Sequence, residues 1–248
     1  MSFKVLSYNI LEGGDDRLSG IAAIIRQQQP DCAALLEANR YANASMLADE
    51  LGMNLAFGQA NNAFHIAWLS RLPIQQQVNH RLARLAKTLL EVVVIWEGTP
   101  LHLFATHLGS RHDKHQPLTE VPALLDVLRP LVETPHLLVG DFNALHPDDP
   151  VGSPPQGEAK RGEAVRGAPR QAIRFLLEAG YIDCYRSCHP QTPGFTYPSL
   201  APWLRLDYIF AAPSVASRLV ACDIVRGSAV EQASDHAPIW AEFRSAAG

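Results

Sequence analysis

Short apolar runs alternate with amphipathic segments along the whole chain. Runs of four to eight apolar residues bounded by turn residues are typical of buried strands. They predict strands at residues 3–10, 32–36, 66–69, 88–96, 101–106, 137–139, 206–210, 219–225 and 239–243. Apolar residues spaced for one helical face predict helices that include Ile21, Ile24 and Ile25 and end before Pro30, and helices at 44–51, 121–131 and 172–179, the last stopped by Gly180.

The order of these elements limits the fold class. Strands outnumber helices, and many consecutive strands lack room between them for a crossover helix. This favours an α/β protein with mixed, mainly antiparallel sheets and helices outside them, over a doubly wound parallel sheet. Residues 147–169 are rich in Pro, Gly and charge, and only about eighty residues follow them. We therefore expect one domain over residues 1–248, with a mobile surface excursion at 147–169.

Composition narrows the class of protein. The chain has 248 residues, 47% of them hydrophobic, a net charge of -4 and a pI near 6.2. This balance argues against a protein that coats nucleic acid regardless of sequence, but a local basic rim or a bound metal could still serve a nuclease. No apolar run approaches the roughly 18 residues of a membrane span. With no leader visible and four scattered cysteines, we expect a cytoplasmic protein with free thiols.

Polar side chains stand at the ends of the apolar strands. They are Asn9, Glu37, His107, Asp141, Asn143, Asp207, Asp235 and His236. A carboxylate among apolar neighbours is costly to bury unless it is paired, hydrogen-bonded or bound to a metal. Each residue alone is as well explained by a salt bridge or a strand cap. Together they predict a shared polar site at one end of the sheets.

The residue types at this site suit phosphoryl chemistry. Carboxylate and amide oxygens without a thiolate match hard cations, so we expect Mg²⁺, with Mn²⁺ as a substitute. A histidine supported by an aspartate can act as a general base or stabilise a charged transition state. An asparagine amide can orient a water or contact a phosphoryl oxygen.

Read in order, the segments around these residues resemble the endonuclease/exonuclease/phosphatase superfamily, which includes AP endonucleases, pancreatic deoxyribonuclease and neutral sphingomyelinases. The matching strings are Ser7-Tyr8-Asn9-Ile10, Leu36-Glu37, Leu69-Ser70-Arg71-Leu72-Pro73-Ile74, Thr106-His107-Leu108, Gly140-Asp141-Phe142-Asn143-Ala144, Arg205-Leu206-Asp207-Tyr208-Ile209-Phe210 and Ser234-Asp235-His236-Ala237-Pro238-Ile239. The resemblance covers residue 5 to about residue 240. It implies a four-layer α/β/β/α sandwich of two sheets with helices on both outer faces.

The resemblance also implies a role for each residue. Glu37 would be the main metal ligand, with Asn9 beside it and Asp235 as a further ligand to the metal or its water. Asp141 would orient or deprotonate the attacking water, and Asn143 would contact the phosphoryl group. His236, held by Asp207, would act on the phosphate, and His107 would bind a non-bridging oxygen. The reaction would be an in-line displacement. One departure is Leu36, which stands where the family usually has glutamine.

Three residues near the site are candidate substrate contacts. Arg111 belongs to a loop at 109–115 dense in cationic and titratable groups, and a solvated loop is the simpler explanation for it. Tyr197 and Trp203 lie in a Pro/Gly-rich stretch before Asp207. They could form an aromatic wall beside the substrate, or they could pack locally against the prolines.

The sequence leaves the substrate and the oligomeric state open. The charge balance, 21 Lys+Arg against 25 Asp+Glu, slightly favours a small phosphoester over nucleic acid. An endo- or exonuclease, or an AP-type repair nuclease, remains the main alternative. A non-catalytic phosphate-binding module is a third reading, but it would have no physical reason to keep the complete metal and His/Asp set.

Overall fold

Two six-stranded sheets form the centre of the computed structural model, which describes residues 2–110, 112–155 and 170–245. Arg111 and most of the predicted excursion at 147–169 therefore lie outside the described residues. The first sheet has the order β11 (Leu219–Ile224), β12 (Ile239–Arg244), β1 (Ser2–Asn9), β2 (Cys32–Leu36), β4 (Ile66–Ser70) and β3 (Asn54–Gly58). The second has the order β5 (Ile74–His80), β6 (Leu89–Trp96), β7 (Thr99–His107), β8 (His136–Asp141), β10 (Asp207–Ala211) and β9 (Ile182–Asp183).

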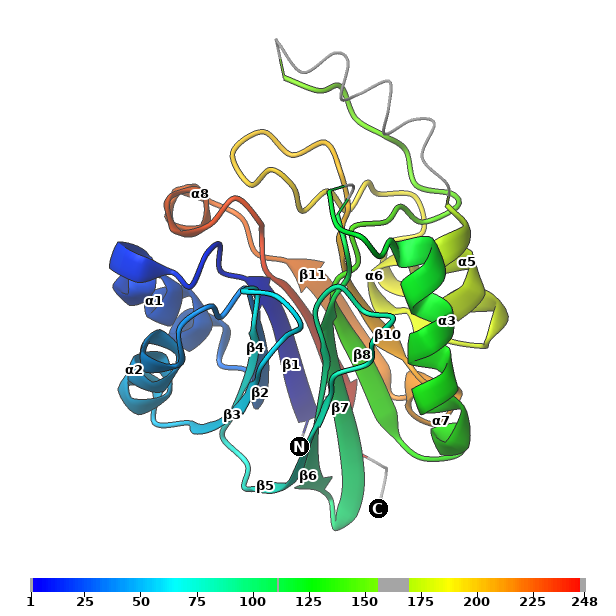
Figure 1. Ribbon diagram of the computed structural model, residues 1–248, viewed down its shortest axis with the longest axis horizontal. Helices are drawn as coiled ribbons and strands as arrows, with labels where there is room; N and C mark the ends of the chain where they lie inside the picture. Colours follow the sequence, from blue (N-terminus) through cyan, green and yellow to red (C-terminus); the bar gives the residue numbers. More distant parts are fainter. Residues whose placement is uncertain (1, 111, 156–169, 246–248) are drawn as a thin grey trace.

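Helices cover the outer face of each sheet, as Figure 1 shows. The first sheet carries α1 (Leu18–Gln28) and α2 (Tyr41–Leu51), and the second carries α3 (Pro117–Leu128) and α5 (Gln171–Glu178). The shorter elements are η1 (Asp15–Arg17), η2 (Arg129–Leu131), α6 (Cys184–Cys188), α7 (Pro213–Ala216) and α8 (Ser228–Ala233). This arrangement confirms the predicted four-layer sandwich. Within the described part of the chain, no helix has both the length and the apolar character needed to cross a membrane.

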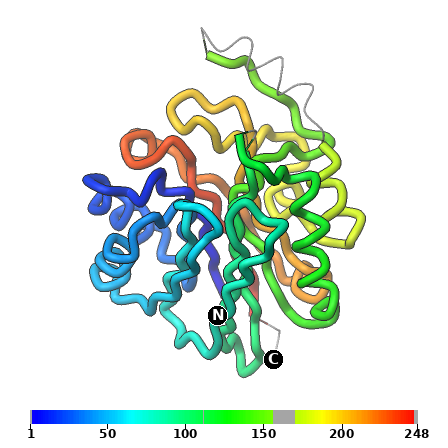
Figure 2. The backbone as a smooth tube through the Cα atoms, viewed as in Figure 1, coloured from blue at the N-terminus to red at the C-terminus, as the bar shows by residue number. Residues whose placement is uncertain are grey.

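The strand pattern follows from burial on both faces. Each sheet has one parallel pair, β1 with β2 and β7 with β8, and its other pairs are antiparallel. Every residue of β2, β4 and β8 is buried, because helices cover one face and the other sheet covers the second. This is why these strands read as continuous apolar runs in the sequence. β1 begins where β12 ends, since Ser2 pairs with Arg244. Figure 2 shows both ends of the chain at the lower edge of the molecule.

The connectivity sends six chain segments to one edge of the sandwich. The carboxyl ends of β1, β2, β7 and β8 reach the upper edge in Figure 1. β10 and β12 run antiparallel to β8 and β1, so they begin at that same edge. Residues far apart in the sequence therefore meet there.

Candidate active site

Strand register places three of the predicted residues side by side in the second sheet. His107 pairs with Asp141 across the parallel strands β7 and β8. Asp207 pairs with Asp141 across the antiparallel strands β8 and β10. Paired residues point to the same face of a sheet, so all three side chains share one face. Asp141 is thus flanked by His107 on one side and by Asp207 on the other.

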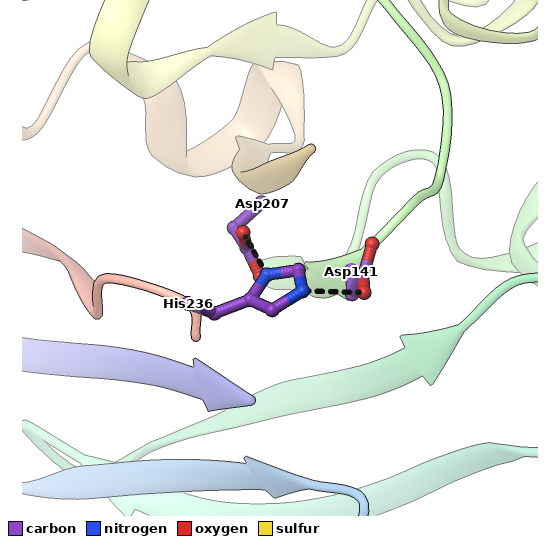
Figure 3. A group of neighbouring side chains, drawn as sticks. All are labelled: Asp141, Asp207 and His236. Carbon is purple, nitrogen blue, oxygen red and sulfur yellow. Dashed lines mark hydrogen bonds and ion pairs between the residues drawn. The ribbon is translucent and has the colours of Figure 1, made fainter. Parts of the chain in front are cut away.

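His236 lies between two of these carboxylates, as Figure 3 shows. Its Nδ1 is 2.8 Å from Asp207 Oδ2, and its Nε2 is 3.7 Å from Asp141 Oδ2. All three side chains are buried. Burial opposes protonation of His236, but the carboxylates of Asp207 and Asp141 outweigh it and raise its pKa. Burial also raises the pKa of Asp141, which the charge of His236 partly offsets.

Asn9 and Glu37 reach the same place from the first sheet. Asn9 pairs with Leu36 across β1 and β2, which sets Glu37 one residue beyond the paired ends. The Asn9 side-chain amide donates to Glu37 Oε1 and to Asp141 Oδ2, both at 3.2 Å, and so connects the two sheets. Glu37 Oε2 accepts the backbone N–H of Glu12 at 2.9 Å.

Asn143 and His107 complete the group. The Asn143 backbone N–H donates to Asp141 Oδ1 at 2.9 Å, and its side-chain amide donates to the carbonyl of Leu108 at 3.0 Å. His107 Nε2 is 3.4 Å from Asp141 Oδ2. Burial lowers the pKa of His107, and the positive charges of Lys87 and His236 lower it further, which favours the neutral imidazole.

The oxygen atoms at the site suit a hard divalent cation. Asp235 Oδ1 and Asp207 Oδ1 are buried and have no hydrogen-bond partner among the described residues. A buried carboxylate oxygen without a partner is unfavourable unless a cation or a water reaches it. Ligand atoms of Asp141, Asp207 and His236 also lie within 4.8 Å of one another. We interpret Asp141, Asp207 and His236 as a histidine held by carboxylates and not as a metal site, because His236 already bonds Asp207 at 2.8 Å.

The three candidate substrate contacts have different outcomes. The Tyr197 ring lies 4.8 Å from the His236 ring, beside the site and half-buried. Trp203 is 1% exposed and packs in a small cluster with Leu145, Leu204 and Leu206. The prediction that Trp203 forms part of an aromatic wall is therefore wrong, because its ring faces the interior. Arg111 is outside the described residues.

Two residues that support the site were not singled out in the sequence. The Ser234 hydroxyl donates to the carbonyl of Asn9 at 2.6 Å and accepts the N–H of His236 at 3.2 Å. It lies in the string that carries the family resemblance, so its position was a usable signal. Lys87 is 2% exposed, close to His107. Its signal was a lysine with apolar residues close on both sides, Leu85 and Ala86 before it and Leu89 and Leu90 after Thr88.

Comparisons with known proteins bear on the family and on the fold. The sequence profile described as "Endonuclease/Exonuclease/phosphatase family" matches residues 6–236. Exodeoxyribonuclease III of Haemophilus influenzae is 28% identical over 154 residues, 56% of this chain and 50% of that protein, so the match spans about half the length of that relative.

Solved structures are similar over almost the whole chain. An AP endonuclease from Archaeoglobus fulgidus has a TM-score of 0.76 at 20% identity, over 98% of this chain and all of that one. The Neisseria 3′ phosphatase NExo, determined with a product DNA hairpin, has a TM-score of 0.75 at 20% identity over the same shares. At these identities the structural likeness establishes the fold.

Proposed function

The chain belongs to the endonuclease/exonuclease/phosphatase family, and we propose that it hydrolyses a phosphodiester bond with the help of a divalent metal ion. The observation that carries this proposal is the buried His236 held between Asp207 and Asp141, at 2.8 and 3.7 Å. A histidine fixed in this way has a set orientation and a stabilised proton, which a phosphate-reading module would not need.

The metal would be held by Glu37, Asn9 and Asp235. The fit rests on their all-oxygen donor atoms and on the unpartnered Asp235 Oδ1. A bound Mg²⁺ or Mn²⁺ would supply positive charge to the phosphate oxygens. Asn9 also donates to Asp141 Oδ2, so the proposed metal ligands and the proposed water-activating carboxylate share a hydrogen bond.

The protein groups have separate tasks in this proposal. Asp141 orients the attacking water and accepts its proton. His236, protonated and held by Asp207, faces the phosphate and stabilises the charge that develops on it. Asn143 contacts the phosphoryl group through its amide, and the neutral His107 hydrogen-bonds a non-bridging oxygen. Positioning and electrostatics would supply most of the rate.

DNA is the first substrate to test. The relatives named above include an exodeoxyribonuclease, an AP endonuclease and a 3′ phosphatase bound to DNA. The net charge of -4 supports a second candidate, a small phosphoester that needs no extended basic surface. Tyr197 beside His236 could stack against a base or a sugar in either case.

The test is a hydrolysis screen with Mg²⁺ or Mn²⁺ on abasic DNA, 3′-phosphate-ended duplex, plasmid and bis-aryl phosphodiester. Asp141→Asn is the inactive variant, and Asp126→Asn is the matched control, since Asp126 is an exposed acid paired with Arg84. We expect activity that EDTA and Asp141→Asn abolish and Asp126→Asn retains. Equal turnover by the Asp141→Asn protein would refute the mechanism.

The metal ligand needs a test that does not depend on substrate. Mg²⁺ should raise the melting temperature of the wild-type protein, because a ligand bound only by the folded state stabilises it. The Glu37→Gln protein should lose most of that rise. If both proteins respond to Mg²⁺ equally, Glu37 is not a ligand. No response in the wild type, together with no hydrolysis, would favour the non-catalytic module.

A further inference from the structure

Lys87 is a buried cation to which the proposed reaction assigns no role. Its side chain is 2% exposed, and its ammonium donates to the carbonyl of Leu108 at 2.9 Å and to Asp113 Oδ2 at 3.3 Å. An ammonium group is costly to bury unless it is paired and hydrogen-bonded. The ion pair with Asp113 is long and partly solvated, since the Asp113 side chain is 24% exposed. The shorter contact is the one with Leu108.

The carbonyl of Leu108 is shared with a proposed catalytic residue. It accepts the side-chain amide of Asn143 at 3.0 Å as well as the ammonium of Lys87. Leu108 directly follows His107, and its own N–H donates to the carbonyl of Asp141 at 2.9 Å. A carbonyl bonded to a cation becomes more polarised and more firmly placed. Lys87 can therefore fix the Asn143 amide through one shared oxygen.

Glu120 of α3 holds the two segments that carry this contact. It is fully buried, its Oε1 accepts the N–H of Ala86 at 2.7 Å, and its Oε2 accepts the N–H of Gly109 at 2.6 Å. Ala86 precedes Lys87 and Gly109 follows Leu108, so both oxygens bind next to the shared contact. One carboxylate thus sets the distance between Lys87 and Leu108.

The charge of Lys87 also reaches the site directly. It contributes to lowering the pKa of His107, after burial, and it acts against the burial that raises the pKa of Asp141. His236 provides the positive charge on the other side of Asp141. A negatively charged phosphate held between His107 and His236 would have a fixed cation on each side.

We propose that Lys87 is a positioning residue: it holds the Leu108 carbonyl, so that the Asn143 amide keeps its place. Lys87 also supplies a fixed positive charge behind His107. This inference rests on the proposed function for its kinetic consequence. The link between Lys87 and Asn143 is a property of the folded protein and can be tested without a substrate.

The central variant is Lys87→Met, which keeps most of the side-chain volume and removes the charge and the hydrogen bonds. Asp113→Asn is the matched control, because it removes the Asp113 charge and leaves the bond from Lys87 to Leu108. We expect Lys87→Met to lower kcat about 10- to 100-fold with a smaller change in KM, as for a displaced catalytic group. Asp113→Asn should change kcat less than about threefold.

A double-mutant cycle separates positioning from a general loss of structure. If Lys87 acts through Asn143, Lys87→Met should lower kcat much less in an Asn143→Ala background than in the wild type. An equal fold-loss in both backgrounds would overturn the proposal, as would wild-type kcat in Lys87→Met. A wild-type protein without activity would refute the proposed function instead, and the spectra described next would still decide the inference.

The spectra are ¹H–¹⁵N correlations of the side-chain amides and the buried ammonium. The Asn143 amide pair, assigned by its loss in Asn143→Ala, should shift in Lys87→Met and stay in place in Asp113→Asn. In case Lys87→Met does not fold, Asn143→Asp tests the link from the other end, since a carboxylate cannot donate to Leu108. It should shift the Lys87 ammonium resonance. Unmoved resonances would overturn the inference.

Discussion

Gly140 is the position where a single added methyl group should damage both the fold and the site. Its φ is 148°, and an ideal Cβ there would lie 1.8 Å from the carbonyl oxygen of Thr106. Thr106 pairs with Gly140 across β7 and β8, one step before the pair of His107 and Asp141. Since real Cβ atoms are rarely closer than 3.0 Å to a neighbour, Gly140→Ala must separate the two chains by at least about 1.2 Å.

The size of the effect follows from this geometry. Overpacking in a dense core costs roughly 1–3 kcal/mol, and an unfavourable φ for alanine adds about 1–3 kcal/mol. For a chain of this length, each kcal/mol lowers Tm by about 2–4 °C, so we expect a fall of roughly 5–20 °C. A shift of about 1 Å between His107 and Asp141 should also lower kcat by about 100-fold.

Thermal denaturation and the hydrolysis assay test both expectations, with Gly98→Ala as the control. Gly98 also has a positive φ, 73°, but nothing lies within 4 Å of its ideal Cβ, so alanine there adds backbone strain without a clash. The difference between the two variants isolates the clash with Thr106. The reasoning is refuted if the Gly140→Ala protein has the same Tm as the Gly98→Ala protein and keeps wild-type turnover.

Three other variants test buried charges. Arg205→Met should lower the free energy of unfolding by about 3–5 kcal/mol, measured by urea titration, because it leaves the buried carboxylate of Asp183 without its guanidinium and removes one of the two that pair with Asp149, the other being that of Arg186; a loss under 1 kcal/mol would contradict this. Burial alone would raise the pKa of Glu91, but hydrogen bonds from two histidines (His80 and His102) lower it below 4.5, so the stability it contributes is present above pH 4.5 and lost as pH falls through its folded value. The urea midpoint of the Glu91→Gln protein should therefore fall less steeply than that of the wild type as the pH is lowered. An equally steep fall would count against this role of Glu91. Glu120→Gln, whose amide has one acceptor oxygen in place of two, should lower the free energy of unfolding by about 1–3 kcal/mol and kcat with it, and full activity would speak against its part in holding Leu108.

Most strands could be predicted because two covered faces leave a strong signal. Residues 32–36 were predicted and observed with the same bounds, since every side chain of β2 is buried. β5 was missed because it is an edge strand of sequence IQQQVNH with three exposed glutamines, and its polar pattern looks like a loop. The short elements β9, α6, α7 and α8 span two to six residues, too few for a periodic pattern.

The gathering of the site residues was also predictable, because each stands where a strand reaches the same edge. The residues that surround and support them could not be predicted. Lys87 meets Leu108 across 21 positions of the sequence, and Glu120 meets Ala86 across 34. No local pattern specifies such a contact. Trp203 is a similar case: its backbone N–H donates to the carbonyl of Tyr197, and its side chain is buried in a cluster with Leu145, which is distant in the sequence.

Two side chains of the site, Glu37 and Asn143, stand on strained backbone. Glu37 and Asn143 have φ values of 58° and 46°, in the left-handed region where glycine is favoured. Such a conformation costs of order 1–3 kcal/mol for a side-chain-bearing residue, and glycine would relieve most of it. The side chains retained there are a carboxylate and an amide that face the same cluster, and the Asn143 backbone and side chain are each tied by a hydrogen bond, to Asp141 and Leu108. At these two positions the side chains supply chemistry that glycine could not, and the hydrogen bonds of Asn143 help to hold its strained backbone in place.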